Sequence, residues 1–508
     1  MGCVLIDGTS LKLEDFAAVV YGGCRVKLSE AAKSRVEAAA QFVQRLSAQG
    51  VVVYGVTTGF GALSRVSISP EQAGELQENL VLSHACGVGE PFPEDVVRGA
   101  MLLRANTLAR GHSGVRVQTL QLILDMLNEA ITPVVPCQGS VGASGDLVPL
   151  AHLALALIGR GQVSSGGRVV RADEELRAHG LSPLGALAPK EGLALINGTA
   201  FMCSMAAIAV LRASNLCRAS DIAASMTFEA LRGLMPALDE RLAKLRPHPG
   251  HGKAARNMSR LLEGSAMTSV AGEKVQDAYS LRCVPQVHGA TKDAVEFVKT
   301  VVETEMNSVT DNPVLFPEDG EVVSGGNFHG QPLAIAMDFL AMAVAELGDI
   351  SERRISRLID PHLSCLPPFL ACEEGLNSGL MVPQYVAAAL VSENKTLCHP
   401  ACVDSIPTSA NQEDHVSMGS WAARKALRVL DNVERVLAIE LLTAAQALEF
   451  LHPLTQGRGT AAAYSAVRRM VPALKRDREL YRDIGLLVRA IASGALVREV
   501  ESSIGPLE

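Results

Sequence analysis

The amino-acid sequence predicts a mainly α-helical protein built on a bundle of long antiparallel helices, with a mixed region at its N-terminal end. Three observations lead to this prediction. The 508 residues are rich in alanine and leucine and only 4% aromatic, a composition that favours packed helices over sheets. Apolar residues recur at helical spacing over segments longer than the average helix. Mixed structure gives way to nearly continuous helix after Asn197, so we expect two domains, 1–198 and 199–508.

The N-terminal region is predicted to combine short strands, glycine loops and helices. A β-branched run over 51–56 predicts a short strand that ends in a glycine loop, so Tyr54 stands beside a flexible segment. Ser69 followed by proline predicts a helix start, and His84 ends the apolar stripe of that helix. On their own, these two residues are more typical of an edge tyrosine and a core histidine than of catalytic groups. The remaining predicted elements are helices over 93–109 and 115–129 and a hairpin over 163–170.

After Asn197 nearly every segment carries the helical period. The polar amide of Asn197 follows directly on the apolar run 193–196. The spacing of apolar residues after it predicts one long helix after another. Several of them exceed the usual helix length, which indicates a bundle. The expected helices cover 201–234, 290–307, 333–358, 385–397 and 416–450.

The stretch 139–150 combines glycine at every third position with two serines and a following apolar run, a pattern that predicts a tight, strained loop. Its inner triplet has a chemical possibility of its own. If the Gly145 nitrogen reaches the Ala143 carbonyl carbon, a ring can close. Loss of water from the ring and from Ser144 then leaves a conjugated exocyclic double bond. The alternative is an ordinary turn before a helix, with Asp146 as its N-cap.

Three later clusters carry polar or aromatic side chains that could serve a site. Gln276, Tyr279 and Arg282 lie three apart, which places them roughly on one side of a helical turn, and an arginine fork suits a carboxylate. Phe328 belongs to a second loop bracketed by glycines. Glu413 belongs to a run of acids just before a long helix. A solvated helix start and acids that complement a helix dipole explain the first and third clusters without any site.

Composition and charge argue against several classes of function. The formal charge is −8 without a basic run, which disfavours nucleic acid as a partner. The N-terminus lacks a signal-peptide pattern and the 11 cysteines follow no framework, so we expect a reduced, cytoplasmic protein. The apolar runs 333–347 and 436–448 are too short and too charged to span a membrane. Since no cysteines or histidines have the paired spacing of a closed site, no metal is expected.

The string from Gly139 to His152, Gly-Ser-Val-Gly-Ala-Ser-Gly-Asp-Leu-Val-Pro-Leu-Ala-His, closely resembles the signature of the aromatic amino acid lyase family, which comprises histidine, phenylalanine and tyrosine ammonia-lyases and related aminomutases. The resemblance implies that Ala143, Ser144 and Gly145 cyclise autocatalytically into 4-methylideneimidazole-5-one (MIO), with no external cofactor. It also implies an aspartase/fumarase-like helix bundle and a homotetramer whose pockets draw residues from more than one subunit. Further segments that look like family motifs are 54–61, 196–199, 276–282 and 310–313.

The same resemblance implies roles for single residues. Tyr54 is expected to be the base, and Arg282 is expected to hold the substrate carboxylate with help from Asn197. His84 and Glu413 are expected to bind the side-chain ring of the substrate, and Glu413 also counts among the catalytic groups. Tyr279 is expected beside the reacting atoms as well. The residues that complete the implied pocket are Gln276, Tyr279 and Phe328.

Two positions indicate which amino acid is the substrate. Ser83-His84 is the pair seen in histidine-specific members and in some tyrosine aminomutases, whereas phenylalanine members typically carry Phe-Leu. The segment 411–418 resembles the histidine form, because Glu413 stands where phenylalanine and tyrosine enzymes usually have aspartate. A carboxylate can accept a hydrogen bond from an imidazole, and a phenyl ring offers none. The expected reaction is elimination of ammonia from L-histidine to give trans-urocanate.

Three other interpretations stay open on the sequence. A tyrosine or phenylalanine ammonia-lyase or an aminomutase would share the MIO group and differ only in its products. A helical lyase of the aspartase/fumarase type would work with an unmodified triplet. A non-catalytic helical scaffold would have no activity for a Ser144 substitution to remove.

Overall fold

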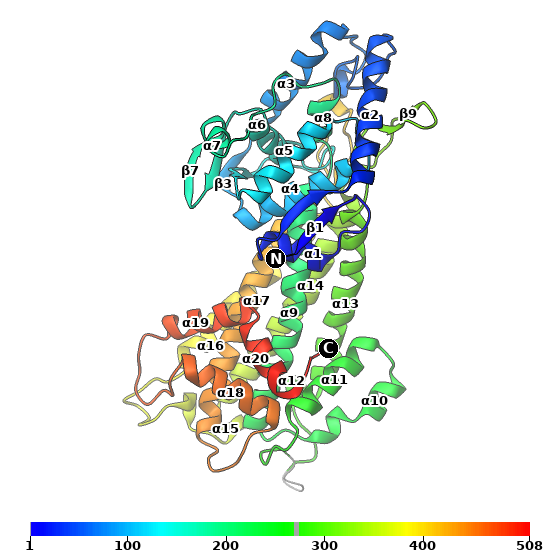
Figure 1. The fold of residues 1–508 in the computed structure, drawn as a ribbon. Helices are drawn as coiled ribbons and strands as arrows, with labels where there is room; N and C mark the ends of the chain where they lie inside the picture. Colours follow the sequence, from blue (N-terminus) through cyan, green and yellow to red (C-terminus); the bar gives the residue numbers. More distant parts are fainter. Residues whose placement is uncertain (1, 269–273) are drawn as a thin grey trace. The chain divides into compact units, whose positions relative to one another are not determined.

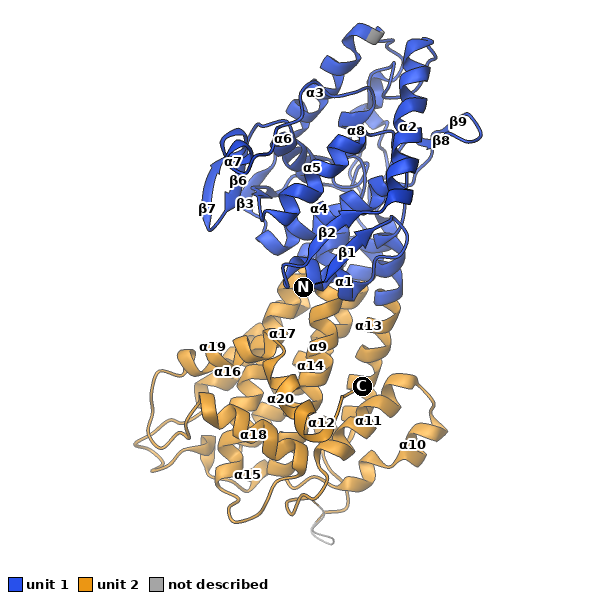
Figure 2. Ribbon diagram, viewed as in Figure 1, with its two compact units in different colours: residues 1–208, 299–338, 400–424 blue, residues 209–298, 339–399, 425–508 orange. Residues whose placement is uncertain are grey.

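The computed structural model describes residues 2–268 and 274–508 and confirms the predicted mainly helical class (Figure 1). Contacts between Cα atoms divide the chain into two compact units (Figure 2). The first unit comprises residues 1–208, 299–338 and 400–424, and the second comprises 209–298, 339–399 and 425–508. The first unit thus contains the predicted N-terminal region 1–198 together with two segments from later in the chain.

The strands of the first unit form four small sheets. β1 (Cys3–Ile6) pairs in parallel with β2 (Arg25–Leu28), and β3 (Val88–Pro91) pairs antiparallel with β5 (Pro136–Gln138). β4 (Thr132–Pro133), β6 (Gln162–Ser165) and β7 (Arg168–Arg171) form a three-stranded sheet in that order, and its β6–β7 part is the hairpin predicted over 163–170. The fourth sheet is the hairpin of β8 (Val314–Phe316) and β9 (Glu321–Val323).

Eight helices of the first unit precede Asn197, and they include the two predicted over 93–109 and 115–129. α4 (Glu94–Ala109) is almost entirely buried, which makes it the central helix of this unit. Ser69 does precede a helical segment, but the first turn is a 3-10 helix at Pro70–Gln72 and the α-helix starts at Ala73. These helices are α1 (Leu13–Val20), α2 (Glu30–Ala48), α3 (Ala73–His84), α4 (Glu94–Ala109), α5 (Val117–Asn128), α6 (Leu147–Leu157), α7 (Ala172–Ala178) and α8 (Glu191–Ile196).

The predicted strand over 51–56 is wrong. The backbone there forms a turn instead, in which the amides of Val56 and Thr57 both donate to the Val53 carbonyl. The Thr57 hydroxyl accepts from the Val53 amide at 2.9 Å and donates to the Val51 carbonyl at 2.8 Å, so the local polar groups are satisfied without a partner strand. β-branched residues predicted a strand because they suit any half-buried surface.

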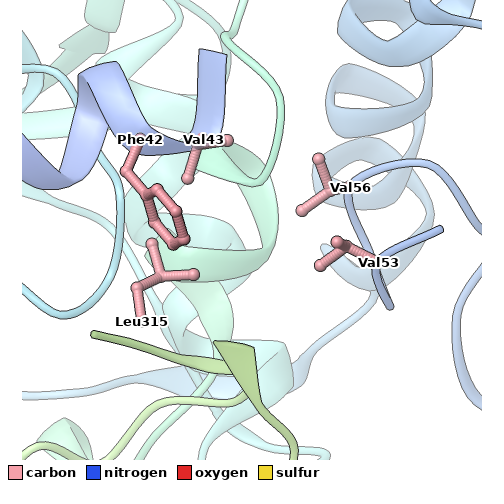
Figure 3. Close-up of a cluster of buried hydrophobic side chains, with 5 residues drawn as sticks. All are labelled: Phe42, Val43, Val53, Val56 and Leu315. Atoms are coloured by element: carbon pink, nitrogen blue, oxygen red, sulfur yellow. The ribbon is translucent and has the colours of Figure 1, made fainter. Parts of the chain in front are cut away.

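The valines of this turn serve the core of the first unit. Val53 and Val56 form a buried cluster with Phe42 and Val43 of α2 and with Leu315 of β8 (Figure 3). The cluster joins segments far apart in the sequence, and two of its members, Val53 and Val56, flank Tyr54 in the turn. Burial of these apolar side chains therefore fixes the backbone around Tyr54.

Four long helices contain residues of both units: α9 (Ala200–Ala230), α13 (Val284–Met306), α14 (Gln331–Ile359) and α17 (Gly419–Glu449). They match the predicted helices closely. In the second unit, Ile355 of α14, Ala387 of α16 and Val436 and Ile439 of α17 form a buried cluster. The remaining helices are α10 (Glu240–Leu245), α11 (Pro249–Leu261), α12 (Tyr279–Arg282), α15 (Pro361–Ser364), α16 (Met381–Leu397), α18 (Arg458–Met470), α19 (Leu480–Ala492) and α20 (Ala495–Ile504).

Helix α9 is long and apolar enough to cross a bilayer by length and composition alone. Within the protein, however, 78% of its most apolar window is buried. It therefore packs as a core helix, as its place among the long helices predicts.

We expect Leu315→Ala to lower the free energy of unfolding by about 2–5 kcal/mol, because the side chain is fully buried against Phe42 and the Val53–Val56 turn. Urea unfolding followed by circular dichroism measures this change. Val323→Ala, on the neighbouring strand β9 at 46% exposure, is the matched control and should change the midpoint little. Equal effects of the two substitutions would contradict the role given to the cluster.

Candidate active site

A cavity of about 910 Å³ in the first unit brings together residues from well-separated segments of the chain. Its wall includes the Tyr54 turn, the end of α3, the glycine loop around Ser144 and the turn after α8. Two later loops close it. The residues named from the sequence that line the cavity are Tyr54, His84, Ser144, Asn197, Phe328 and Glu413.

The glycine loop is tightly folded at the bottom of this cavity. Ser144 has a φ of +51°, a conformation that is strained for a residue with a side chain. The Gly145 amide turns back toward the Gly142 carbonyl at 3.4 Å. Gly145 itself has a φ of +79°, and a Cβ there would lie 2.2 Å from the Gly198 carbonyl oxygen. Only glycine fits at this position, so the sequence prediction of a strained loop is confirmed.

Two backbone hydrogen bonds hold the loop against the turn after α8. The Gly198 amide donates to the Ser144 carbonyl at 3.1 Å, and the Asp146 amide donates to the Gly198 carbonyl at 2.7 Å. Gly198 has a φ of +131°, and a Cβ there would lie 2.7 Å from Arg104 Nη1. The loop and the turn therefore pass each other with no space for a side chain at Gly145 or Gly198.

Asp146 occupies the N-cap position of α6, as the sequence predicts, but its side chain does not cap that helix. Its side chain makes no hydrogen bond to α6 and instead accepts from the Phe201 and Met202 amides, both at 2.9 Å, at the N-terminus of α9. The residue is fully buried, and this burial raises its pKa to about 7, although the two amide donors oppose the shift. Asp146 thus ties the glycine loop to the start of a long core helix.

The Tyr54 side chain is oriented by its own turn. The Gly61 amide donates to Tyr54 Oη at 3.1 Å, and the Phe60 ring meets the Tyr54 ring edge-on at a centroid distance of 6.4 Å. Gln77 of α3, which the sequence did not single out, clamps this turn. Its side-chain amide donates to the Gly55 carbonyl at 3.0 Å and accepts from the Leu193 amide at 3.0 Å.

His84 and Glu413 act on one another across the cavity. Burial lowers the pKa of His84, whereas the Leu80 carbonyl and the charge of Glu413 oppose that shift. Ser83 Oγ lies 3.1 Å from His84 Nδ1. Glu413 is held in turn by Thr408, whose hydroxyl donates to Glu413 Oε2 at 2.7 Å. The imidazole is therefore biased toward its neutral form beside a carboxylate.

Asn197 presents an acceptor to the cavity. Its Nδ2 donates to the Asn312 carbonyl at 3.0 Å, while its buried Oδ1 has no hydrogen-bond partner among the described residues. A free amide oxygen suits an ammonium group rather than a carboxylate. Asn312, which the sequence placed in a motif without a role, also lines the cavity and is held by the Gly325 amide at 2.8 Å.

Gln276, Tyr279 and Arg282 belong to the second unit and do not line this cavity. The prediction that all three share one helical turn is wrong, because α12 starts at Tyr279 after Ala278, an extended residue at its N-cap. Tyr279 is 71% exposed, and the Arg282 guanidinium carbon lies over its ring, 4.8 Å from the ring centroid. Arg282 Nε is buried and has no hydrogen-bond partner within the described part of the chain.

The loop fits the cyclisation that its residue types suggest. The Gly145 nitrogen is already turned back along the chain, the Ala143 side chain is small, and Ser144 faces the cavity. The positive end of α6 begins at Leu147, next to the triplet, and favours negative charge there. Among the residues that the structure describes, no group of three or more His, Cys, Asp or Glu side chains could hold a metal ion.

Comparison with known proteins places these features in a family. A profile described as "Aromatic amino acid lyase" matches residues 11–469. The histidine ammonia-lyase of Symbiobacterium thermophilum is 55% identical over 502 residues, which cover 99% of each chain. The crystal structure of histidine ammonia-lyase from Trypanosoma cruzi matches 99% of this chain and 96% of its own, with a TM-score of 0.92 and 44% identity. Tyrosine aminomutase from Streptomyces globisporus matches 99% and 100%, with a TM-score of 0.95 and 39% identity.

We expect Asp146→Asn to change how stability depends on pH. The carboxyl titrates near 3.8 in the unfolded chain and at about 7 in the folded protein, so the folded protein binds more protons between these values. The free energy of unfolding contributed by Asp146 therefore falls as the pH rises through this window, and an asparagine removes that fall. Urea midpoints at about pH 5 and about pH 8 measure the difference. An unchanged difference in the variant would contradict the assigned pKa.

Proposed function

Because the chain belongs to the aromatic amino acid lyase family, we propose that it eliminates ammonia from L-histidine and yields trans-urocanate. One observation supports this substrate most directly. His84 and Glu413 lie in the same cavity as Ser144 and Tyr54, so a carboxylate and a largely neutral imidazole face the space where a substrate ring would lie. A phenyl ring would offer no donor to the second oxygen of Glu413, which is unfavourable in a partly buried site.

The proposed prosthetic group forms from the chain itself. The Gly145 nitrogen bonds to the Ala143 carbonyl carbon, whose oxygen leaves as water with the protons of the Gly145 and Ser144 amides. Ser144 then loses its hydroxyl together with its Cα proton as a second water. Once formed, the ring supplies an electrophilic exocyclic carbon, which makes the substrate amine a better leaving group. The fold contributes the strain of the loop and the donors that flank it.

Tyr54 Oη is the proposed base that takes the proton from Cβ of histidine. A phenol ordinarily titrates at about 10, so the phenolate must be stabilised to act near neutral pH. The Gly61 amide donates to this oxygen at 3.1 Å and orients it. The Gln77 clamp and the buried valines of the turn hold Oη in place.

The substrate ring is recognised by His84 and Glu413 in this proposal. Ser83 Oγ occupies the Nδ1 side of His84, so Nε2 is left to bond the substrate imidazole. Thr408 occupies one oxygen of Glu413, and the second oxygen accepts the single N–H of the neutral substrate ring, whose other nitrogen faces His84. Phe328 closes the apolar side of the cavity.

The α-amino and carboxylate groups of histidine need separate partners. Asn197 Oδ1 is the proposed acceptor for the α-ammonium, because its amide nitrogen is already engaged by Asn312. Arg282 is the proposed partner of the carboxylate, with Gln276 and Tyr279 beside it. Since Tyr279 is exposed and Arg282 Nε is unpaired within the described residues, we propose that they serve the pocket of another subunit in a homotetramer.

The test offers L-histidine, L-tyrosine and L-phenylalanine separately to the purified protein and follows conjugated acids by ultraviolet absorbance and β-amino acids by chromatography. Urocanate from histidine alone is expected. The similarity to a tyrosine aminomutase makes coumarate or β-tyrosine the competing outcome, and either product in place of urocanate would refute the proposed substrate.

Ser144→Ala should keep its fold and lose nearly all turnover, because the hydroxyl that must leave is gone. Full activity in that variant would refute the self-derived group.

We expect Glu413→Gln to lower kcat/KM for histidine about 10- to 100-fold, which is the loss of one charge-assisted hydrogen bond. Steady-state kinetics measures the effect. Asp414→Asn is the matched control, since it removes the same charge from the adjacent residue, which does not line the cavity. An equal loss in both variants would mean that the general charge of this loop, rather than a contact with the substrate ring, controls turnover.

A further inference from the structure

Arg104 is a fully buried cation behind the glycine loop that the mechanism above does not use. It lies in α4, and its side chain is among the largest fully buried ones in the described protein. Its Nη1 donates to the Asn197 carbonyl at 2.5 Å. Neither Nε nor Nη2 has a hydrogen-bond partner among the described residues. A guanidinium with five donors thus makes a single hydrogen bond to the rest of the described chain.

The charges around Arg104 do not cancel. The anion that acts on it is Asp311, but Asp311 already pairs with Lys190 at 2.7 Å, and both side chains of that pair are fully buried. Two buried cations therefore share one carboxylate. Burial of an unmatched charge is costly in a protein interior, so a purely structural site would be expected to use a neutral donor.

The need of the Asn197 carbonyl for a hydrogen-bond donor does not explain the positive charge of Arg104 either. Asn197 is the C-cap of α8, and its carbonyl needs a donor there. A neutral side-chain amide would meet that need. What the guanidinium adds is a positive charge on a peptide group whose other end bonds the glycine loop.

We propose that Arg104 polarises the Asn197–Gly198 peptide and thereby strengthens the hydrogen bond from the Gly198 amide to the Ser144 carbonyl oxygen. The carbonyl that accepts from Arg104 and the amide that donates to Ser144 at 3.1 Å belong to the same peptide group. Withdrawal of electron density at the carbonyl makes the amide a better donor. Arg104 is thus a positioning residue that acts through one peptide on the Ser144 oxygen.

The proposal rests on the cyclised triplet of the proposed function and concerns the atom where charge collects. When a nucleophile adds, its electron pair forms a bond to Cβ of residue 144. The pair of the exocyclic double bond then shifts into the ring, and negative charge develops on the residue-144 oxygen until a proton neutralises it. A donor aimed at that oxygen stabilises the charge. The same polarisation acidifies the Ser144 Cα–H, whose proton must leave with the second water.

The experiment compares the parent protein with Arg104→Gln, which keeps a donor but removes the charge, and with Arg104→Lys, which keeps the charge. Arg354→Gln is the matched control, because Arg354 is equally buried and pairs with Glu440 in the second unit. Intact mass reports how many waters the triplet has lost. Hydroxylamine, a neutral nucleophile that the buried charge does not attract, reports the rate of addition through loss of the ultraviolet chromophore.

In Arg104→Gln we expect addition to slow about tenfold or more, or the triplet to retain the water of Ser144, while Arg104→Lys and Arg354→Gln resemble the parent. The proposal is overturned if Arg104→Gln loses both waters and reacts at the parental rate, if it loses neither water, or if Arg104→Lys reacts as slowly. If Arg104→Gln does not fold, Asp311→Asn provides the test. Removal of the opposing anion should accelerate the addition of hydroxylamine, and an unchanged or slower rate overturns the proposal. A parent protein that has lost no water would instead refute the proposed function.

Discussion

The pair of backbone hydrogen bonds between the glycine loop and the turn after α8 is the constraint on which the rest of this site depends. It sets Ser144 in a strained conformation and leaves no space for a side chain at Gly145. Asp146 then anchors the loop to α9, and Asn197 is brought to the cavity wall by the same turn. The proposed cyclisation of three ordinary residues needs such a rigid frame, because ring closure competes with every other conformation of a short peptide.

Several buried polar atoms around this frame lack hydrogen-bond partners among the described residues. Asn197 Oδ1, Asp146 Oδ1 and two nitrogens of Arg104 are all buried without hydrogen-bond partners among the described residues. Most buried polar atoms in proteins are paired, so a cluster of exceptions indicates function rather than stability. The surrounding apolar packing, including the valines that flank Tyr54, offsets this local cost and keeps the polar atoms in place.

Substrate choice in this family is a matter of a few side chains and not of the fold. The chain superimposes on a tyrosine aminomutase as closely as on a histidine ammonia-lyase. The segment that carries Glu413 reaches the cavity through three consecutive residues at positive φ, Ser409, Ala410 and Asn411. That backbone delivers the carboxylate to a position opposite His84, and both side chains are held by hydroxyl groups of neighbouring residues. Selectivity for a polar ring can therefore change while the catalytic frame stays the same.

The sequence by itself determined the long helices, the β6–β7 hairpin and the strained glycine loop, because helical periodicity and glycine spacing are local signals. It also identified six residues that meet in one cavity. It was wrong about the strand over 51–56, where Thr57 satisfies the backbone locally, and about the helical turn at Gln276, because α12 begins only at Tyr279. Asp146 takes its predicted place before α6, but its side chain bonds the distant N-terminus of α9. Gln77 and Arg104 carried no sequence signal at all. Only the tertiary structure decided their roles, since a buried polar side chain takes its function from the distant backbone groups that the fold brings within hydrogen-bonding distance.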